Sequence, residues 1–401
     1  MNYPAQKSSL IHTLGFKRVY PSVLIQLKLT QLPQVKRLEE AIEKLIEILP
    51  QIACGYDFTE NCFYLVTEKI LQVIDGKGNI YDTKLDFLHQ PQVKIYLRQQ
   101  GDTGELIMMG SHIFSDASGF KQLLYALIAL YNGAEASELG ENQWEIMDVY
   151  RSFKQKTSSV SRSDSSEPLN LPFASNQGEK TYKMANRITL SVEELAKLKA
   201  YGKQRGFSLN DSLLAGYMRF LAKYNPTHSE IQLACPTDTR QFLAEDKGLR
   251  IGNYTARYNP IVSLTHHEPF WQSVAKVHEE MALLKRNREF IESIQPLLSD
   301  SAQSLDEIRA ALKQTYHPRK ISYTNMMTID EKRLNFEDAQ VVDAFMSGSF
   351  RKTPGYQVCF NTFKQQLNLV CTVEGSQENQ RQAMNYLFEI KQELLTGLEE
   401  E

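Results

Sequence analysis

A serine-rich stretch near the middle of the chain separates two parts that show the same kind of pattern. Residues 157–178 carry seven serines and two prolines without sustained hydrophobic periodicity, which is typical of an exposed linker. On both sides of this stretch, short apolar runs alternate with segments whose apolar residues follow helical spacing. The pattern therefore predicts an α/β (α+β) protein with two parts of similar size, residues 1–156 and 179–401.

Individual elements can be predicted on both sides of the linker. In the first part we expect strands at 20–29, 62–67, 93–98 and 106–110 and helices at 38–49 and 120–131. In the second part we expect strands at 231–235, 321–326, 356–363 and 366–374 and a long helix at 376–398. Ser191–Glu194 and Ser208–Asp211 have the spacing of capping boxes, so each predicts the start of a helix.

Composition excludes several classes of protein. The 45 Lys and Arg residues and 48 Asp and Glu residues give a net charge of −3, too little to attract nucleic acid over long range. The longest wholly apolar run, residues 123–131, is about half of a membrane span, and the N-terminus lacks a signal pattern. The five cysteines are odd in number and form no CxxC pair, which argues against disulfides. We therefore expect a soluble cytoplasmic protein with no membrane segment and no nucleic acid partner.

The common catalytic and metal-binding motifs are missing from the sequence. GxSxG, GxxxxGK[ST] and a complete GxGxxG do not occur. No two histidines are spaced i, i+4, so we expect no metal site on a helix.

One segment combines residues that could perform acid–base chemistry. His112 follows an apolar strand, Asp116 comes four residues later, and an amphipathic helix begins near Gly119. A strand-to-helix corner fixes side chains at the edge of a core, where burial tunes an imidazole as a general base. A plainer interpretation is that Asp116 or Ser118 caps the helix and that His112 is a hydrogen-bonded, half-buried residue. The spacing alone favours the plainer interpretation.

Further segments occur together with this one, in a characteristic order. They are Gly206–Gly216 (GFSLNDSLLAG), Cys235–Arg240 (CPTDTR), Gly252–Tyr254 (GNY), Ile321–Asn325 (ISYTN) and a closing hairpin followed by a helix. With His112-x3-Asp116, the chain resembles the HxxxD acyltransferase superfamily over roughly residues 20–390. That superfamily includes chloramphenicol acetyltransferase, plant acyl-CoA acyltransferases, wax ester synthases, alcohol acetyltransferases and nonribosomal-peptide condensation domains.

The resemblance implies a fold and a mechanism. Two chloramphenicol-acetyltransferase-like lobes, each a mixed β-sheet flanked by helices, would enclose a tunnel with His112 at its middle. His112 would act as general base on a hydroxyl or amine acceptor. Asp116 would point away from the substrate and pair with Arg240, which fixes the loop and joins the lobes.

The resemblance also implies residues that bind the substrates. We expect Ser111, Asn253, Tyr254, Tyr323 and Asn325 at the substrate site. As donors to the oxyanion of the tetrahedral intermediate, Ser322, Thr324, Asn325, Asn253 and Tyr254 are candidates, with Asn325 favoured. Strand alternation places Ser322 and Thr324 opposite Tyr323 and Asn325, so we expect one of these pairs to line the tunnel.

The resemblance further implies an acyl-CoA or a carrier-protein phosphopantetheine thioester as co-substrate, no tightly bound cofactor, and no metal. An acyl carrier protein is the partner that this co-substrate suggests, and a monomer would suffice because one chain carries both lobes. Two positions depart from the common HHxxxDG form, since Ser111 precedes His112 and Ala117 follows Asp116. A stand-alone condensation-type protein, or a catalytically silent member that docks a carrier protein, therefore stays open beside an active acyltransferase. An unrelated two-domain α/β protein is a third hypothesis.

Overall fold

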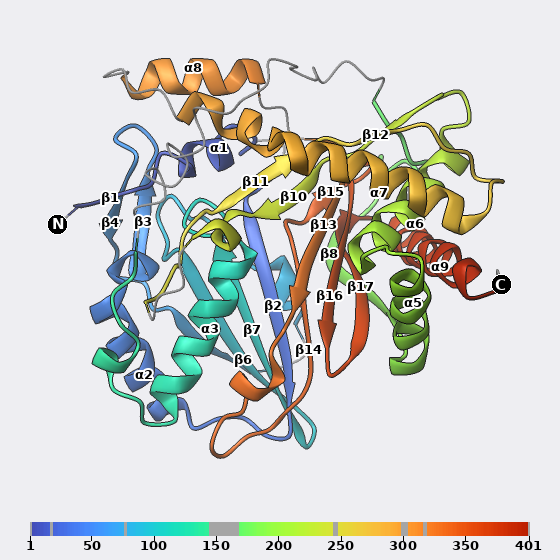
Figure 1. Cartoon of the computed structure of the whole chain (residues 1–401). Coiled ribbons are helices and arrows are strands. Elements are labelled where there is room, and N and C mark those ends of the chain that lie inside the picture. Colours follow the sequence, from blue (N-terminus) through green and yellow to red (C-terminus); the bar gives the residue numbers. More distant parts are fainter. Residues whose placement is uncertain are drawn as a thin grey trace.

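The computed structural model describes residues 2–16, 19–75, 78–143, 168–243, 248–297, 304–315 and 319–399. Within these residues the chain forms two five-stranded sheets, and helices pack against both (Figure 1). The predicted mixed α/β architecture with two lobes is confirmed. Among the described residues, no helix combines the length and the apolar character that a membrane span requires.

The first sheet has the strand order β14-β2-β7-β6-β5. Its strands are β2 (Ser22–Leu29), β5 (Leu71–Ile74), β6 (Val93–Gln100), β7 (Thr103–Ser111) and β14 (Val341–Ser347). Two helices that contact each other, α2 (Val35–Ile48) and α3 (Ala117–Tyr131), belong to this half (Figure 1). Helix α2 buries Leu38, Ile42 and Leu45, the residues whose spacing predicted it.

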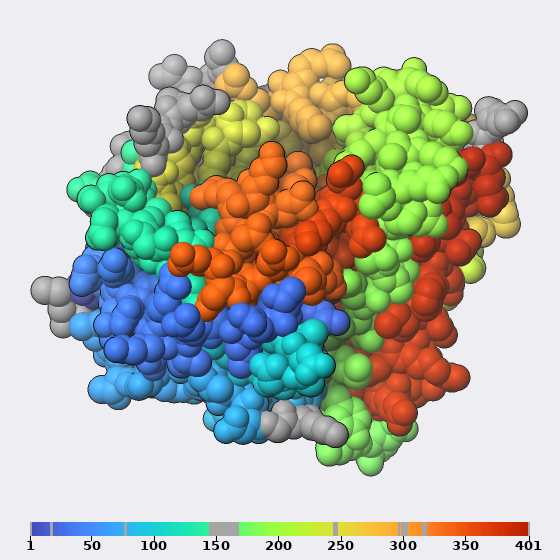
Figure 2. Space-filling view, turned by 90° about the horizontal axis from the view of Figure 1, so that it is seen from below, coloured from blue at the N-terminus to red at the C-terminus, as the bar shows by residue number. Residues whose placement is uncertain are grey.

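Strand β14 was not predicted, and it joins distant parts of the chain. It lies in the C-terminal half of the sequence, yet it pairs with β2 in antiparallel register, with Met346 opposite Ile25. Figure 2 shows this orange segment seated against the blue N-terminal residues. The proposed lobe boundaries stay a prediction, but this strand of the C-terminal part completes the sheet of the N-terminal part.

The second sheet has the order β13-β16-β17-β15, and β8 also pairs with β17. Its strands are β8 (Tyr182–Leu190), β13 (Ile321–Thr328), β15 (Arg351–Lys352), β16 (Tyr356–Phe363) and β17 (Gln366–Gly375). The helices around it are α5 (Val192–Gln204), α6 (Leu209–Tyr224), α7 (Phe270–Asn287) and α9 (Gln377–Glu399). Both predicted capping boxes are confirmed, since the side chain and backbone of each box exchange hydrogen bonds at the starts of α5 and α6.

Shorter strands and helices lie outside the two five-stranded sheets. Strands β1 (Asn2–Pro4), β3 (Cys54–Asp57) and β4 (Cys62–Leu65) form a small sheet, and the short helices are α1 (Ser9–Thr13) and α8 (Leu305–Thr315). Two further pairs are β10 (Cys235–Asp238) with β11 (Thr255–Tyr258) and β9 (Ile231–Gln232) with β12 (Ile261–Val262). The single strand predicted at 231–235 is wrong: β9 ends at Gln232 and β10 begins at Cys235, because the chain passes there from one partner strand to another.

Buried apolar residues form two cores, one in each lobe. The first contains the sheet residues around β2, β6 and β7 together with residues of β14, and the second surrounds α6, α9 and β17. Of the predicted linker, residues 157–167 lie outside the described residues. Residues 168–178 form neither helix nor strand, but they are not an exposed linker throughout, because Leu171 is buried in the second core and Phe173 packs on Tyr386.

Candidate active site

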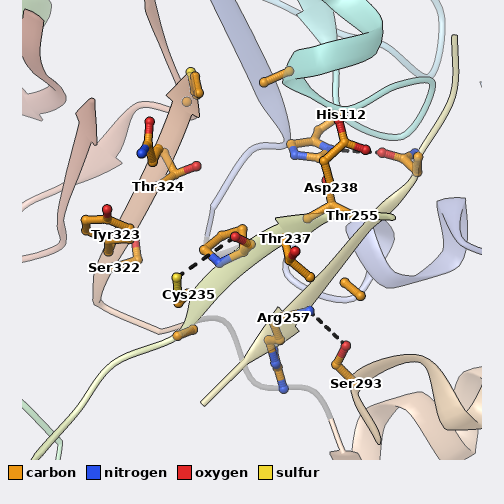
Figure 3. Close-up of a pocket in the computed structure, with 18 of the residues that line it drawn as sticks. His112, Cys235, Thr237, Asp238, Thr255, Arg257, Ser293, Ser322, Tyr323 and Thr324 are labelled. Carbon is orange, nitrogen blue, oxygen red and sulfur yellow. Dashed lines mark hydrogen bonds between the residues drawn. The ribbon is translucent and has the colours of Figure 1, made fainter. Parts of the chain in front are cut away.

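A cavity of about 630 Å³ is lined by residues from both the N-terminal and the C-terminal parts of the chain. Its lining includes His112 after β7, Cys235, Thr237 and Asp238 of β10, Thr255 and Arg257 of β11, and Ser322 to Met327 of β13 and its C-terminal end. Figure 3 shows His112 on one side of this space and Ser322, Tyr323 and Thr324 on the other. The cavity therefore lies where the sequence predicts the tunnel, with the proposed base exposed to it.

His112 is held by Asn253, 141 residues further along the chain. The distance between His112 Nδ1 and Asn253 Oδ1 is 3.1 Å, and Asn253 Nδ2 donates to the Ile113 carbonyl at 3.0 Å. Because the Asn253 amide nitrogen is committed to Ile113, its oxygen faces the imidazole and accepts a hydrogen bond from Nδ1–H. Nε2 of His112 then carries the lone pair, as a general base requires.

The surroundings of His112 keep its imidazole neutral. Burial lowers the pKa of His112 below its ordinary value, and the Arg351 charge also lowers it. The Asp116 charge and the hydrogen bonds of the ring oppose this effect, but burial dominates. At neutral pH the ring is therefore an unprotonated base.

Asp116 caps helix α3 and does not face the cavity. Its Oδ1 accepts from Gly119 N at 2.9 Å, and its Oδ2 accepts from Tyr254 N at 2.7 Å. Burial alone would raise the pKa of Asp116, but the Arg240 charge and these hydrogen bonds hold it below its ordinary value. Both oxygens of the buried Asp116 carboxylate therefore accept hydrogen bonds, so this side chain has a structural role.

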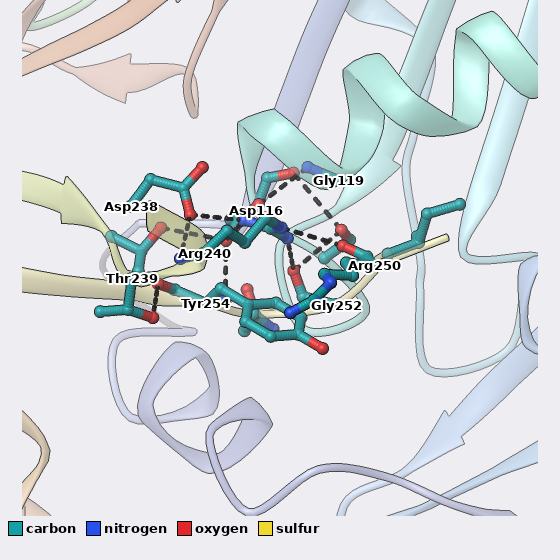
Figure 4. Close-up of polar contacts among 12 residues, drawn as sticks. Asp116, Gly119, Asp238, Thr239, Arg240, Arg250, Gly252 and Tyr254 are labelled. Carbon is teal, nitrogen blue, oxygen red and sulfur yellow. Dashed lines mark hydrogen bonds and ion pairs between the residues drawn. The ribbon is translucent and has the colours of Figure 1, made fainter. Parts of the chain in front are cut away.

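Arg240 forms the predicted ion pair with Asp116, at 2.9 Å between Nη1 and Oδ2 (Figure 4). The same guanidinium bonds Asp238 Oδ1 at 3.0 Å and the carbonyl oxygens of Arg250 and Gly252 at 3.0 and 2.9 Å. Its carbon lies 4.2 Å from the ring centroid of Tyr254. Each guanidinium nitrogen of Arg240 therefore donates a hydrogen bond. The Asp116–Arg240 pair connects the loop after β7 to the segment between β10 and β11.

The departure at Ala117 leaves this loop intact. Ala117 is the first residue of α3, a position that suits alanine. The glycine that the loop needs is Gly119, where a Cβ would lie 2.0 Å from Ser115 Oγ and 3.3 Å from Arg240 Nη2.

Two of the predicted substrate-binding residues do not reach the cavity. Ser111 is fully buried, and its hydroxyl oxygen accepts from Ile113 N at 3.2 Å within the loop. Tyr254 is buried beneath Arg240, and its hydroxyl donates to the Gln143 carbonyl at 2.6 Å. The structure assigns both to packing, because the hydrogen bonds of the loop and of the Arg240 network turn them away from the cavity.

Strand β13 lines the cavity with residues of both its faces. Ser322, Tyr323, Thr324 and Asn325 all contribute to the lining, so the expectation that only one alternating pair does is wrong. The reason is that β13 is an edge strand, paired with β16 alone among the described strands, so its open edge and both adjoining faces meet the cavity.

Asn210 hydrogen-bonds two residues of β13 that line the cavity. Tyr323 Oη and Asn325 Nδ2 both donate to Asn210 Oδ1, at 2.9 and 3.1 Å. Asn325 Oδ1 accepts from Met327 N at 3.0 Å. The Asn325 amide is thus engaged within this strand and with Asn210. Ser322 Oγ accepts from Arg351 Nη2 at 3.2 Å, which leaves its own hydroxyl proton to be donated, and the Thr324 hydroxyl also borders the cavity. Asn210 was overlooked as a site residue although it belongs to the LND segment.

His12 is a further residue at the site that no sequence pattern predicted. Its ring stacks on that of His112 with centroids 3.9 Å apart and planes inclined by 18°. Helix α1 has only five residues, too few for a periodic signal.

Cysteine thiolates and clustered metal ligands are two further sources of chemistry at a site. Cys235 lines the cavity, but burial raises the pKa of its thiol to about 11, so it is not a ready nucleophile. Within the described ranges, no group of three or more His, Cys, Asp or Glu side chains could hold a metal ion.

No family model and no curated protein matches this chain. Solved structures match it over nearly its whole length. Polyketide synthase associated protein 5 from Mycobacterium tuberculosis is 14% identical, with 100% of both chains covered and a TM-score of 0.69. The first condensation domain of the calcium-dependent antibiotic synthetase is 14% identical, with 99% of this chain and 96% of that chain covered and a TM-score of 0.67.

A trichothecene 15-O-acetyltransferase from Fusarium sporotrichioides is 12% identical, with 98% and 95% covered and a TM-score of 0.64. The fold is therefore the one shared by condensation domains and chloramphenicol-acetyltransferase-like acyltransferases, as the resemblance in the sequence predicted.

Proposed function

We propose that this protein is an acyltransferase that moves an acyl group from a thioester to a hydroxyl or amine acceptor. The observation that carries the proposal is the imidazole of His112, which borders a cavity between two lobes with Nδ1 held by Asn253 Oδ1 at 3.1 Å. This arrangement leaves Nε2 as the proton acceptor.

The reaction follows from this geometry. His112 Nε2 takes the proton from the acceptor hydroxyl or amine, whose oxygen or nitrogen forms a bond to the thioester carbonyl carbon. The carbonyl oxygen becomes an oxyanion, and the hydroxyls of Thr324 and Ser322 are the donors that we assign to it. When the carbon–sulfur bond breaks, the imidazolium returns the proton to the departing thiolate.

The cavity lining supports a thioester donor that carries phosphate. Arg257, Lys285 and Arg319 all border the cavity, and their positive charge suits the phosphates of coenzyme A or of a phosphopantetheine arm. The names of two similar structures, a polyketide synthase associated protein and a condensation domain of a synthetase, favour a carrier protein as one source of the donor. Since one chain supplies both walls, we propose that a monomer is sufficient.

The test is transfer from a panel of acyl-CoA and acyl-carrier-protein thioesters to a metabolite extract, with mass detection of acylated products and of released thiol. We expect product with the wild-type protein and a loss of about 10²–10⁴-fold with His112→Ala. His89→Ala is the matched control, because His89 is exposed and does not border the cavity.

Transfer by His112→Ala at the wild-type rate would contradict the role of the base. No transfer from any thioester, together with binding of a carrier protein, would favour the silent docking protein instead.

A further inference from the structure

The N-terminal segment crosses from the second core to the loop that carries His112. Leu10 and Ile11 of helix α1 are buried in the second core, and Thr13 Oγ1 donates to the Leu10 carbonyl at 2.7 Å. Residues on both sides of His112, by contrast, belong to the first core, namely Met109 and Ile113. The stack of His12 on His112 therefore joins an element fixed on one core to a loop fixed on the other.

The same segment also holds the residue that orients His112. Gln6 Oε1 accepts from the backbone N of Asn253 at 2.9 Å, and Asn253 Oδ1 faces His112 Nδ1. Gly252 permits this approach, because a Cβ there would lie 2.8 Å from Gln6 Oε1. Gln6 and His12 thus hold His112 from two directions, one through the edge of its ring and one through its face.

The stacking geometry determines what His12 can do. With the planes inclined by 18° and the centroids 3.9 Å apart, the nitrogens of each ring point sideways and not at the other ring. No proton can pass directly between two rings in this arrangement. The His12 ring instead covers one face of the imidazole, excludes water from it and restricts rotation of the ring.

We propose that His12 is a positioning residue, which clamps the face of His112 so that the Nε2 edge stays directed at the cavity. This role rests on the proposed function of His112 as the general base. The proton transfer itself takes place between the acceptor, His112 and the thiolate, and His12 stays neutral throughout.

The charges around the pair agree with a neutral His12. Burial lowers the pKa of His12 well below its ordinary value, and His112 lowers it further. The other charged groups that act on His112 are Asp116, which raises its pKa, and Arg351, which lowers it. Because two positive charges 3.9 Å apart repel strongly, the two rings do not carry a second proton at the same time, and the Asp116 charge favours His112 as the ring that takes one.

The test reads the His112 ring directly by NMR, from its carbon-bound proton and its ring nitrogens, over a pH series. His112→Gln assigns the resonances, and His89→Ala serves as the control for a histidine outside the site. In the wild type we expect the Nδ1–H tautomer and a pKa below the ordinary value. In His12→Ala, water reaches the exposed face, so we expect the pKa of His112 to rise towards its ordinary value and the tautomer signal to become mixed.

Two further variants separate the clamp from simple loss of packing. His12→Phe keeps a flat ring without a titrating group, so His112 should titrate as in the wild type. His12→Leu fills the space without a ring face, so His112 should titrate as in His12→Ala. If the alanine variant does not fold, the leucine variant still tests whether a ring face is needed. Unchanged titration in both His12→Ala and His12→Leu, or a Phe variant that behaves like them, would overturn the proposal.

Kinetics provide an independent reading. We expect His12→Ala to lower kcat about tenfold with little change in KM, and His12→Phe to recover most of that loss. If NMR shows the clamp but no thioester is turned over, the proposed function fails and the clamp stands. If transfer occurs and the pKa and tautomer of His112 do not change in the His12 variants, the positioning role of His12 is wrong and the proposed function stands.

Discussion

His112 and Asp116 lie four residues apart in one loop, yet their surroundings differ in kind. Asp116 has both oxygens saturated by Arg240 and by backbone N–H groups, and it faces away from the cavity. His112 has one nitrogen bonded to Asn253, one ring face stacked on His12, and its remaining nitrogen available at the cavity. The difference teaches that a short motif can place a fully satisfied structural anchor next to an incompletely satisfied chemical group.

The largest effect that we predict concerns the anchor. Arg240→Ala leaves the Asp116 carboxylate buried without its partner, so we expect a loss of about 3–5 kcal/mol in the free energy of unfolding. Urea denaturation measures this change. Lys36→Ala breaks an exposed ion pair with Glu40 and should have no measurable effect.

A double variant sharpens the comparison. Asp116→Ala combined with Arg240→Ala removes both charges, so the loss should be smaller than the sum of the single losses. An Arg240→Ala protein as stable as Lys36→Ala would show that the anchor contributes nothing.

The next prediction concerns the hydrogen bond between His112 and Asn253. Asn253→Ala removes the acceptor for His112 Nδ1–H, so we expect kcat to fall about fivefold, because one hydrogen bond is worth about 1 kcal/mol. Asn253→Asp keeps an acceptor but adds a negative charge, which stabilises the imidazolium and raises the pKa of His112. The acid limb of the pH–rate profile should therefore move to higher pH in Asn253→Asp, and an unmoved limb would exclude Asn253 as the partner of His112.

The smallest effect is expected at Ser111, which the sequence suggested as a substrate-binding residue. Its hydroxyl oxygen accepts from Ile113 N within the loop, so Ser111→Ala should lower stability by about 1 kcal/mol and leave KM for donor and acceptor unchanged. Steady-state kinetics with a thermal melt measure both. A KM raised several-fold would return Ser111 to the substrate site.

The features that the sequence predicted well depend on neighbours in the chain. The Ser191 and Ser208 capping boxes and the hairpin between β16 and β17 are set by a few consecutive residues; Lys364 and Gln365 adopt φ values of 44° and 61° in that turn. The Asp116–Arg240 pair could be predicted because the resemblance joined two distant motifs.

The features that were missed depend on packing between distant segments. Strand β14 gains its partner β2 from more than 300 residues away, as the Ser22–Ser349 hydrogen bond across 327 residues illustrates. His12 comes from a helix too short to show periodicity, and Ser111 and Tyr254 turn from the cavity because of contacts that no local pattern contains.

The pH dependence of kcat/KM for the wild-type protein tests the central claim most directly, because it reports the ionisation of the free enzyme's base. Burial lowers the pKa of His112, so activity should stay on a plateau through neutral pH and fall only as the pH drops below the ordinary histidine value of 6.5. His112→Ala should retain no such limb in its residual rate. A limb at or above 6.5, or the same limb in His112→Ala, would contradict the account of His112 as a neutral, cavity-facing base.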